Sequence, residues 1–83
     1  MDVLKEVNRT LDEVLSLKGR GMAFTLDTPL LGAIPELDSM AVVTLITTLE
    51  ERFDLVVDDD DISGDTFASV GTLVDFLSAK LSS

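Results

Sequence analysis

Apolar residues recur at intervals of three and four positions in three separate stretches of the chain. In the first stretch, residues 3–17, one helical face would hold Val3, Val7, Leu11 and Val14. This spacing is that of an amphipathic α-helix. Asp2 stands where a capping residue would, and Gly19 breaks the pattern. We therefore expect a first helix in residues 3–17.

The second stretch is residues 39–52, and Asp38 before it is a favoured N-cap residue. Its inward positions would be Val42, Leu45, Ile46, Leu49 and Phe53. Many β-branched residues lower its intrinsic helix propensity, so this helix must depend on tertiary packing. The third stretch is residues 69–81, with Ser69 as its cap. Its inward positions would be Val70, Leu73, Val74, Leu77 and Leu81.

The connections differ in composition. Residues 19–37 contain glycine and proline, which disfavour regular structure, together with many apolar residues that must pack onto the bundle. Residues 54–61 are an extended apolar piece followed by acids, after which Ile62 and Phe67 would anchor a short helical turn around 60–67. No stretch shows strand alternation. The pattern predicts a small all-α bundle with three principal helices and one short helix.

Composition narrows the chemistry. The chain has no cysteine and no histidine, so thiolate metal sites and the usual general base at neutral pH are missing. A self-sufficient hydrolase or a zinc enzyme is thereby disfavoured.

The formal charge of the chain is −10. This charge repels nucleic acid and anionic lipid, and it favours a monomer whose partners carry basic patches. No apolar run approaches the roughly 20 residues that span a bilayer, and the first residues lack a signal-peptide pattern. We expect a cytoplasmic protein.

Ser39 stands one position inside the second predicted helix, directly after its cap. Because Asp38 already serves as the cap, the Ser39 hydroxyl is free to point outward at the positive end of the helix dipole. That position stabilises a phosphate ester. Nothing in the chain can activate this serine as a nucleophile, so another protein would have to modify it. The alternative is that Ser39 only helps to satisfy the free backbone amides of the first turn.

The stretch LDSM, followed by a helix that ends LEERFD, resembles the acyl carrier protein and peptidyl carrier protein family. The resemblance implies a four-helix bundle with a short third helix and a long first loop, formed by residues 1–83 as a single carrier domain. It also implies a non-enzymatic function. The family's serine receives 4′-phosphopantetheine from coenzyme A, and acyl or aminoacyl groups are carried as thioesters on its thiol.

Carried over by position, the resemblance makes Ser39 the attachment site, while Asp38 caps the helix and helps the transferase to place its metal ion. Residues expected to face partner enzymes are Met40, Val43, Thr44, Thr47, Glu50 and Glu51. Residues expected to line the space for an acyl chain are Val42, Leu45, Ile46, Leu49, Ile62, Phe67 and Leu73. The implied partners are a phosphopantetheinyl transferase, and ligases, acyltransferases and synthases with basic patches.

The chain departs from the family pattern in places. Glu36 stands where the family often has glycine, and Ala41 and Thr44 stand where many fatty acid carriers have acids. These differences favour a dedicated pathway over housekeeping fatty acid synthesis. The stretch TPLLGAIPELDSMAVV is similar to carrier proteins that accompany bacterial exosortase and exopolysaccharide systems.

Two other interpretations stay open at this point. An acidic helical adaptor without a prosthetic group would use exposed Met40 and Val43 to dock a partner. The stretch DDDDISGD resembles part of a calcium loop that starts at Asp59, but Val70 stands where the loop needs a bidentate glutamate. A solvated acid run is therefore the simpler interpretation of that stretch, and we assign no metal site.

Overall fold

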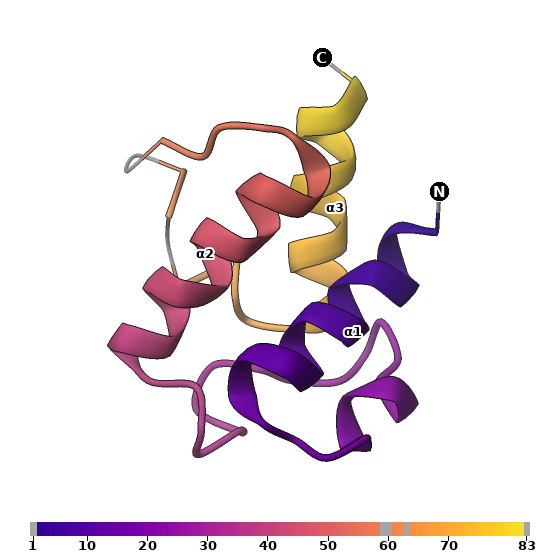
Figure 1. The fold of residues 1–83 in the computed structure, drawn as a ribbon, viewed down its shortest axis with the longest axis vertical. Helices are drawn as coiled ribbons and strands as arrows, with labels where there is room; N and C mark the ends of the chain where they lie inside the picture. Colours follow the sequence, from indigo (N-terminus) through magenta and orange to yellow (C-terminus); the bar gives the residue numbers. More distant parts are fainter. Residues whose placement is uncertain (1, 59–60, 63, 83) are drawn as a thin grey trace.

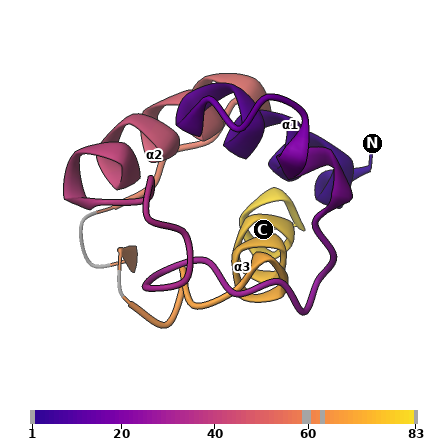
Figure 2. The same ribbon diagram turned by 90° about the horizontal axis from the view of Figure 1, so that it is seen from below.

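The structure is a computed structural model that describes residues 2–58, 61–62 and 64–82. Its α-helices are α1 (Val3–Leu15), α2 (Ser39–Phe53) and α3 (Val70–Ser82), and a 3-10 helix, η1 (Arg20–Ala23), follows α1 (Figure 1). Figure 2 shows α1 and α2 along one side of the bundle and α3 on the other, with the connecting segments around them. None of the helices in the described residues has the length and apolar content that a membrane crossing requires.

The three predicted helices are confirmed, with ends that differ by one or two residues. α1 stops at Leu15 because Ser16 takes a left-handed conformation, with φ of 55°, and its N–H bonds to the carbonyl of Asp12. Asp54 ends α2 in the same way, with φ of 52°. The inward faces meet in one core, and its fully buried members include Val7, Leu11, Leu30, Leu45, Val70 and Leu77. Leu30 and Leu37 are the buried contributions of the long loop to this core.

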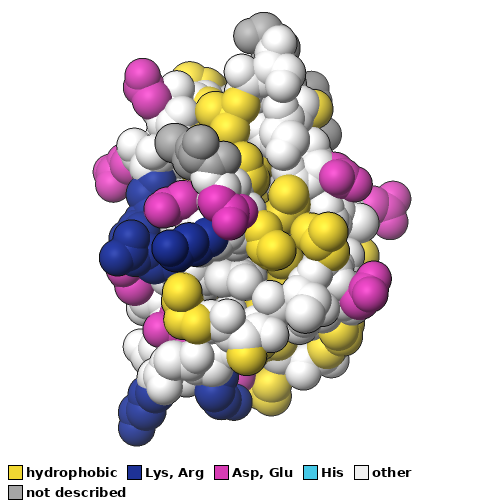
Figure 3. Space-filling view, turned by 90° about the vertical axis from the view of Figure 1, so that its right-hand side faces the viewer, with side chains coloured by type: hydrophobic (Ala, Val, Ile, Leu, Met, Phe, Trp, Pro, Cys, Tyr) yellow, Lys and Arg dark blue, Asp and Glu magenta, His cyan; other side chains and the backbone are white. Residues whose placement is uncertain are grey.

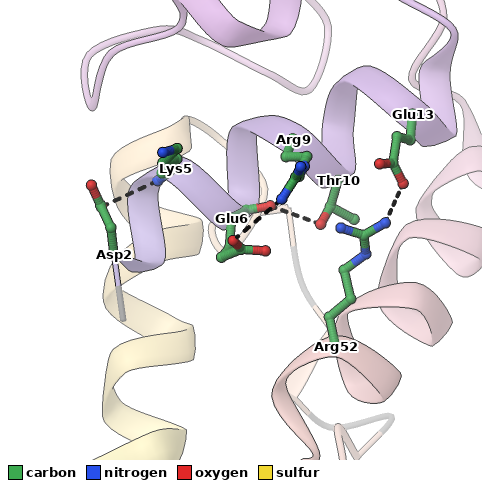
Figure 4. Close-up of polar contacts among 7 residues, drawn as sticks. All are labelled: Asp2, Lys5, Glu6, Arg9, Thr10, Glu13 and Arg52. Atoms are coloured by element: carbon green, nitrogen blue, oxygen red, sulfur yellow. Dashed lines mark hydrogen bonds and ion pairs between the residues drawn. The ribbon is translucent and has the colours of Figure 1, made fainter.

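α1 is fixed to its neighbours by polar contacts near its C-terminal end. The Arg52 guanidinium of α2 pairs with Glu13 of α1 (Figure 4). On the loop side, the Asp12 carboxylate accepts hydrogen bonds from Gly19 N at 2.8 Å and Gly21 N at 3.2 Å. A Cβ at Gly21 would lie 2.9 Å from the Asp12 Cβ, so the close approach of η1 to α1 requires glycine.

The long loop pairs with the segment that leads into α3. Leu30 N donates to Ala68 O at 3.0 Å, and Leu31 N donates to Phe67 O at 3.0 Å. In the other direction, Val70 N donates to Thr28 O at 2.9 Å and Gly71 N to Leu26 O at 2.8 Å. The last two bonds give the first two amides of α3 their acceptors. The first two place the loop beside Phe67 and Ala68, which positions one wall of the site described below.

The all-helical class is confirmed, but the expected four-helix count is not. The short helix expected around 60–67 falls partly on residues 60 and 63, which lie outside the described residues. Residues 64–67 form turns rather than an α-helix. Nearby carbonyls are taken by hydroxyls: Thr66 Oγ1 donates to Asp61 O, and Thr72 Oγ1 donates to Thr66 O. Among the elements fully within the described residues, the further helical turn is η1 in the first loop, which the sequence pattern did not predict.

Candidate functional site

Ser39 is the first residue of α2, and Asp38 before it is the N-cap, as predicted. Asp38 has extended backbone angles, and its carboxylate accepts a hydrogen bond from Ala41 N at 2.8 Å. Its carbonyl accepts the first helical bond, from Val42 N at 2.9 Å. The cap is thus complete without the Ser39 side chain, which is exposed.

The amides of Ser39 and Met40 have no hydrogen-bond acceptor among the described residues. α3 differs, because Thr28 O and Leu26 O of the long loop, and Ser69 Oγ, accept from its first three amides. Two free N–H groups beside an exposed hydroxyl, at the positive end of a helix dipole, form a donor set suited to a phosphate ester. The residues present therefore fit a phosphate-linked prosthetic group on Ser39.

Ser39 has no histidine beside it to activate it as a nucleophile. The chain has no histidine or cysteine, and the neighbouring Asp38 carboxylate is engaged with Ala41 N. No described residue accepts a hydrogen bond from the Ser39 hydroxyl. An exposed serine in these surroundings fits a hydroxyl that another protein modifies.

A groove of about 540 Å³ opens beside the Ser39 hydroxyl. Its walls come from the long loop, from α2 and from the segment before α3, and they are formed by Leu31, Asp38, Ser39, Val42, Val43, Ile62, Gly64 and Phe67. Apart from Asp38 and Ser39, these side chains are apolar or absent. The loop–α3 pairing fixes one wall, since Leu31 N is bonded to Phe67 O.

The residues expected to line an acyl chain divide into two groups. Val42, Ile62 and Phe67 line the groove. Leu45, Ile46, Leu49 and Leu73 do not line it but lie in the buried core. Leu31 was missed by sequence reasoning, although it lines the groove and is 46% exposed. The sequence showed only that this Gly/Pro-containing loop is rich in apolar residues. That composition does not identify which of them lies at the groove.

The residues expected to face partners also differ among themselves. Met40 and Val43 are 75% and 60% exposed, and Thr44, Thr47 and Glu51 are exposed as well. Glu50 is only half-exposed, and its carboxylate accepts a hydrogen bond from Val57 N at 3.0 Å. Glu50 therefore holds the end of α2 to the segment that follows it, and its role toward partners stays a prediction.

Two ion pairs flank this region. Arg20 of η1 contacts Glu36 at 2.6 Å, and this hydrogen bond lowers the pKa of the Glu36 carboxyl. Lys80 of α3 contacts Asp61 at 2.7 Å, which lowers the pKa of Asp61 and raises that of Lys80. The calcium-like stretch includes residues 59–60 and 63, outside the described part of the chain. Among the described residues, no group of three or more carboxylates is placed to hold a metal ion.

Comparison with known proteins gave one family and one close structural relative. Residues 2–77 match the family described as a phosphopantetheine attachment site. The solution NMR structure of a holo acyl carrier protein from Nitrosomonas europaea is 52% identical, with a TM-score of 0.93 and full coverage of both chains. No match was found among curated proteins.

Proposed function

Because the chain belongs to the phosphopantetheine attachment site family and is an acyl carrier protein, we propose that Ser39 bears its 4′-phosphopantetheine. The observation that carries this assignment is the exposed Ser39 hydroxyl at the start of α2, beside two amides without acceptors. Asp38 takes over the capping that a serine at a helix start usually performs.

The residues around Ser39 have separate tasks in this proposal. Asp38 fixes the turn into α2 through its bond to Ala41 N, and it is the carboxylate available to help a transferase place its metal ion. The amides of Ser39 and Met40 would donate to phosphate oxygens, whose charge the helix dipole would also stabilise. The bound group supplies a flexible arm that ends in a thiol, on which acyl groups are carried as thioesters.

We also propose that an apolar cargo rests in the groove beside Ser39. Val42, Ile62 and Phe67 line it, and each buried methylene would contribute about 0.8 kcal/mol. Binding to the folded state alone raises stability, so longer aliphatic acyl groups should raise the melting temperature of the loaded protein. Leu45, Ile46, Leu49 and Leu73 would contact only a cargo that opens the core further, because they are almost fully buried.

The proposed role of the whole protein follows from this assignment of Ser39. Residues 1–83 act as one carrier domain, a monomer in the cytoplasm that does not itself catalyse a reaction. Its partners are a phosphopantetheinyl transferase and enzymes with basic patches that load, extend or remove acyl or aminoacyl groups. The pathway is lipid, polyketide or exopolysaccharide biosynthesis, and the loop sequence favours the last of these.

The test is the intact mass of the protein after incubation with coenzyme A and a broad-specificity phosphopantetheinyl transferase. Wild type should gain the mass of one phosphopantetheine, and Ser39→Ala should gain nothing while keeping its helical circular dichroism. Ser69→Ala is the matched control, since Ser69 also stands at a helix start, and it should be modified like wild type. An unchanged wild-type mass, or modification of Ser39→Ala, would refute the assignment. An adaptor would bind its partners equally well with alanine at position 39.

A further inference from the structure

Glu36, two residues before the Asp38 cap, forms an ion pair with Arg20 of η1. The Arg20 guanidinium donates to the Glu36 carboxylate at 2.6 Å, and this bond is the main reason why the pKa of Glu36 is lowered. Glycine, which often stands at this position in the family, could not form such a pair. The pair joins the first loop directly after α1 to the turn that leads into α2.

The backbone around Arg20 is itself fixed to α1. The Arg20 amide and the Arg20 Nε both donate to the carbonyl of Leu17, each at 3.2 Å, and the Leu17 side chain is buried. On either side of Arg20, the amides of Gly19 and Gly21 donate to the Asp12 carboxylate. The guanidinium therefore reaches Glu36 from a part of the chain that is held to the first helix.

The turn that carries Glu36 has little backbone support. Among the described residues, the backbone of residues 35–37 makes one hydrogen bond, from Leu37 N to Ile34 O at 3.0 Å, and that bond is local. α3 differs, because its first two amides donate to carbonyls of the long loop. The entrance to α2 is thus held to the rest of the bundle by side chains, among them the buried Leu37 and the paired Glu36.

We propose that Arg20 is a positioning residue for the modification of Ser39: its ion pair with Glu36 holds the turn that leads into α2, and thereby the direction of the Ser39 hydroxyl. The inference rests on the proposed function. In that reaction the Ser39 oxygen bonds to the phosphorus next to the pantetheine arm of coenzyme A. The pyrophosphate bond breaks, adenosine 3′,5′-bisphosphate leaves, and the hydroxyl proton passes to the transferase or to solvent. The rate of such a step depends on the alignment of the attacking oxygen, so a looser turn should slow it.

The experiment removes the ion pair from each side and then restores it. Arg20→Gln and Glu36→Gln each remove one charge and keep a polar side chain. The double variant Arg20→Glu/Glu36→Arg restores the pair with its charges exchanged. Arg52→Gln is the matched control, because Arg52 also joins two elements, through Glu13 of α1 (Figure 4), and its loss changes the net charge as Arg20→Gln does. Exposed ion pairs contribute little to stability, so all four variants should remain folded.

Two quantities are measured with a broad-specificity transferase and saturating coenzyme A. One is the rate constant of transfer in a single turnover at saturating transferase, and the other is the transferase concentration that gives half of it. Arg20→Gln and Glu36→Gln should each lower the rate constant about threefold, within the range that an exposed ion pair contributes, and change the half-saturating concentration by less than about twofold. The double variant should recover most of the rate constant. Arg52→Gln should transfer at the wild-type rate.

The outcomes separate the inference from the proposed function. Equal slowing by Arg52→Gln would assign the effect to charge or stability in general and overturn the inference. So would a double variant as slow as the single variants, or single variants that raise only the half-saturating concentration, because Arg20 would then contact the transferase rather than hold the turn. Each of these results leaves Ser39 as the attachment site. If Arg20→Gln, which also loses its bond to Leu17 O, were unstable, Glu36→Gln would test the same pair. If wild type were not modified at all, the proposed function would fail, and the inference with it.

Discussion

Two serines stand at helix starts, and one residue of offset separates their roles. Ser69 precedes α3, and its Oγ accepts from Thr72 N at 3.2 Å, so it acts as a cap. Ser39 is already inside α2, where the Asp38 carboxylate has taken the equivalent bond. Both residues are serines, so residue type does not explain the difference. The Ser39 hydroxyl is available for modification because Ser39 follows the N-cap position, whereas Ser69 occupies it.

This division of tasks predicts different costs for three alanine substitutions. Asp38→Ala and Ser69→Ala should each lower the free energy of unfolding by about 1 kcal/mol, because each removes a capping acceptor. Ser39→Ala should change it by less than about 0.5 kcal/mol, as for other surface substitutions. Urea unfolding of the three apo variants measures this. A loss for Ser39→Ala as large as that for Asp38→Ala would show that Ser39 shares the cap.

At the scale of elements, the sequence predicted the features that depend on periodic spacing or on contacts between neighbouring residues. The three helices and the Asp38 cap follow from spacing and capping chemistry, which act within a few residues. The pairing of the loop with the start of α3 is non-local and uses backbone atoms, as in the bond from Gly71 N to Leu26 O, so it leaves no periodic trace in the sequence. η1 was missed for a related reason, since Asp12 organises it from the preceding helix.

The same limit explains the partial prediction of the groove. Helical periodicity shows that Val42, Leu45 and Leu49 face inward, but not whether the inward face meets the core or an open groove. That depends on where the loop crosses the bundle. The loop buries Leu30 completely and leaves Leu31 at the groove, a difference of one residue that only the fold determines.

Gly71 provides a direct test of the loop–α3 pairing. A Cβ at this position would lie 2.7 Å from Leu26 O, so Gly71→Ala must displace the loop. Overpacking of this kind costs about 1–3 kcal/mol, although alanine favours helix by up to about 1 kcal/mol over glycine. We expect net destabilisation in urea unfolding. Gly64→Ala is the control, because its Cβ would meet only Leu31 Cδ2 at 3.8 Å, and it should be nearly neutral. A stabilised Gly71→Ala would mean that the loop does not pack so closely.

At the scale of the whole molecule, charge is distributed unevenly. On the face that Figure 3 shows, Lys and Arg side chains lie at the left and lower left, hydrophobic side chains lie across the middle, and acids lie on both sides. Residues 39–49 of α2 carry no charge at all. Acids exceed bases by sixteen to six. The protein thus combines a long-range negative field with a short-range apolar contact surface beside Ser39. Salt screens the field but not apolar contacts, so ionic strength should distinguish their effects.

Sodium chloride should therefore change stability and partner encounter in opposite directions. Between about 0.1 M and about 1 M salt, the screening length falls from about 10 Å to about 3 Å. Screening relieves the self-repulsion of the −10 charge, so the melting temperature should rise by several degrees, equivalent to about 1 kcal/mol for a domain of this size. The same screening should slow modification by a basic transferase.

The double variant Glu51→Gln/Asp75→Asn, which removes two exposed acids, should melt higher than wild type at low salt and respond less to added salt. A wild-type melting temperature that falls or stays constant with salt would mean that self-repulsion does not limit this fold.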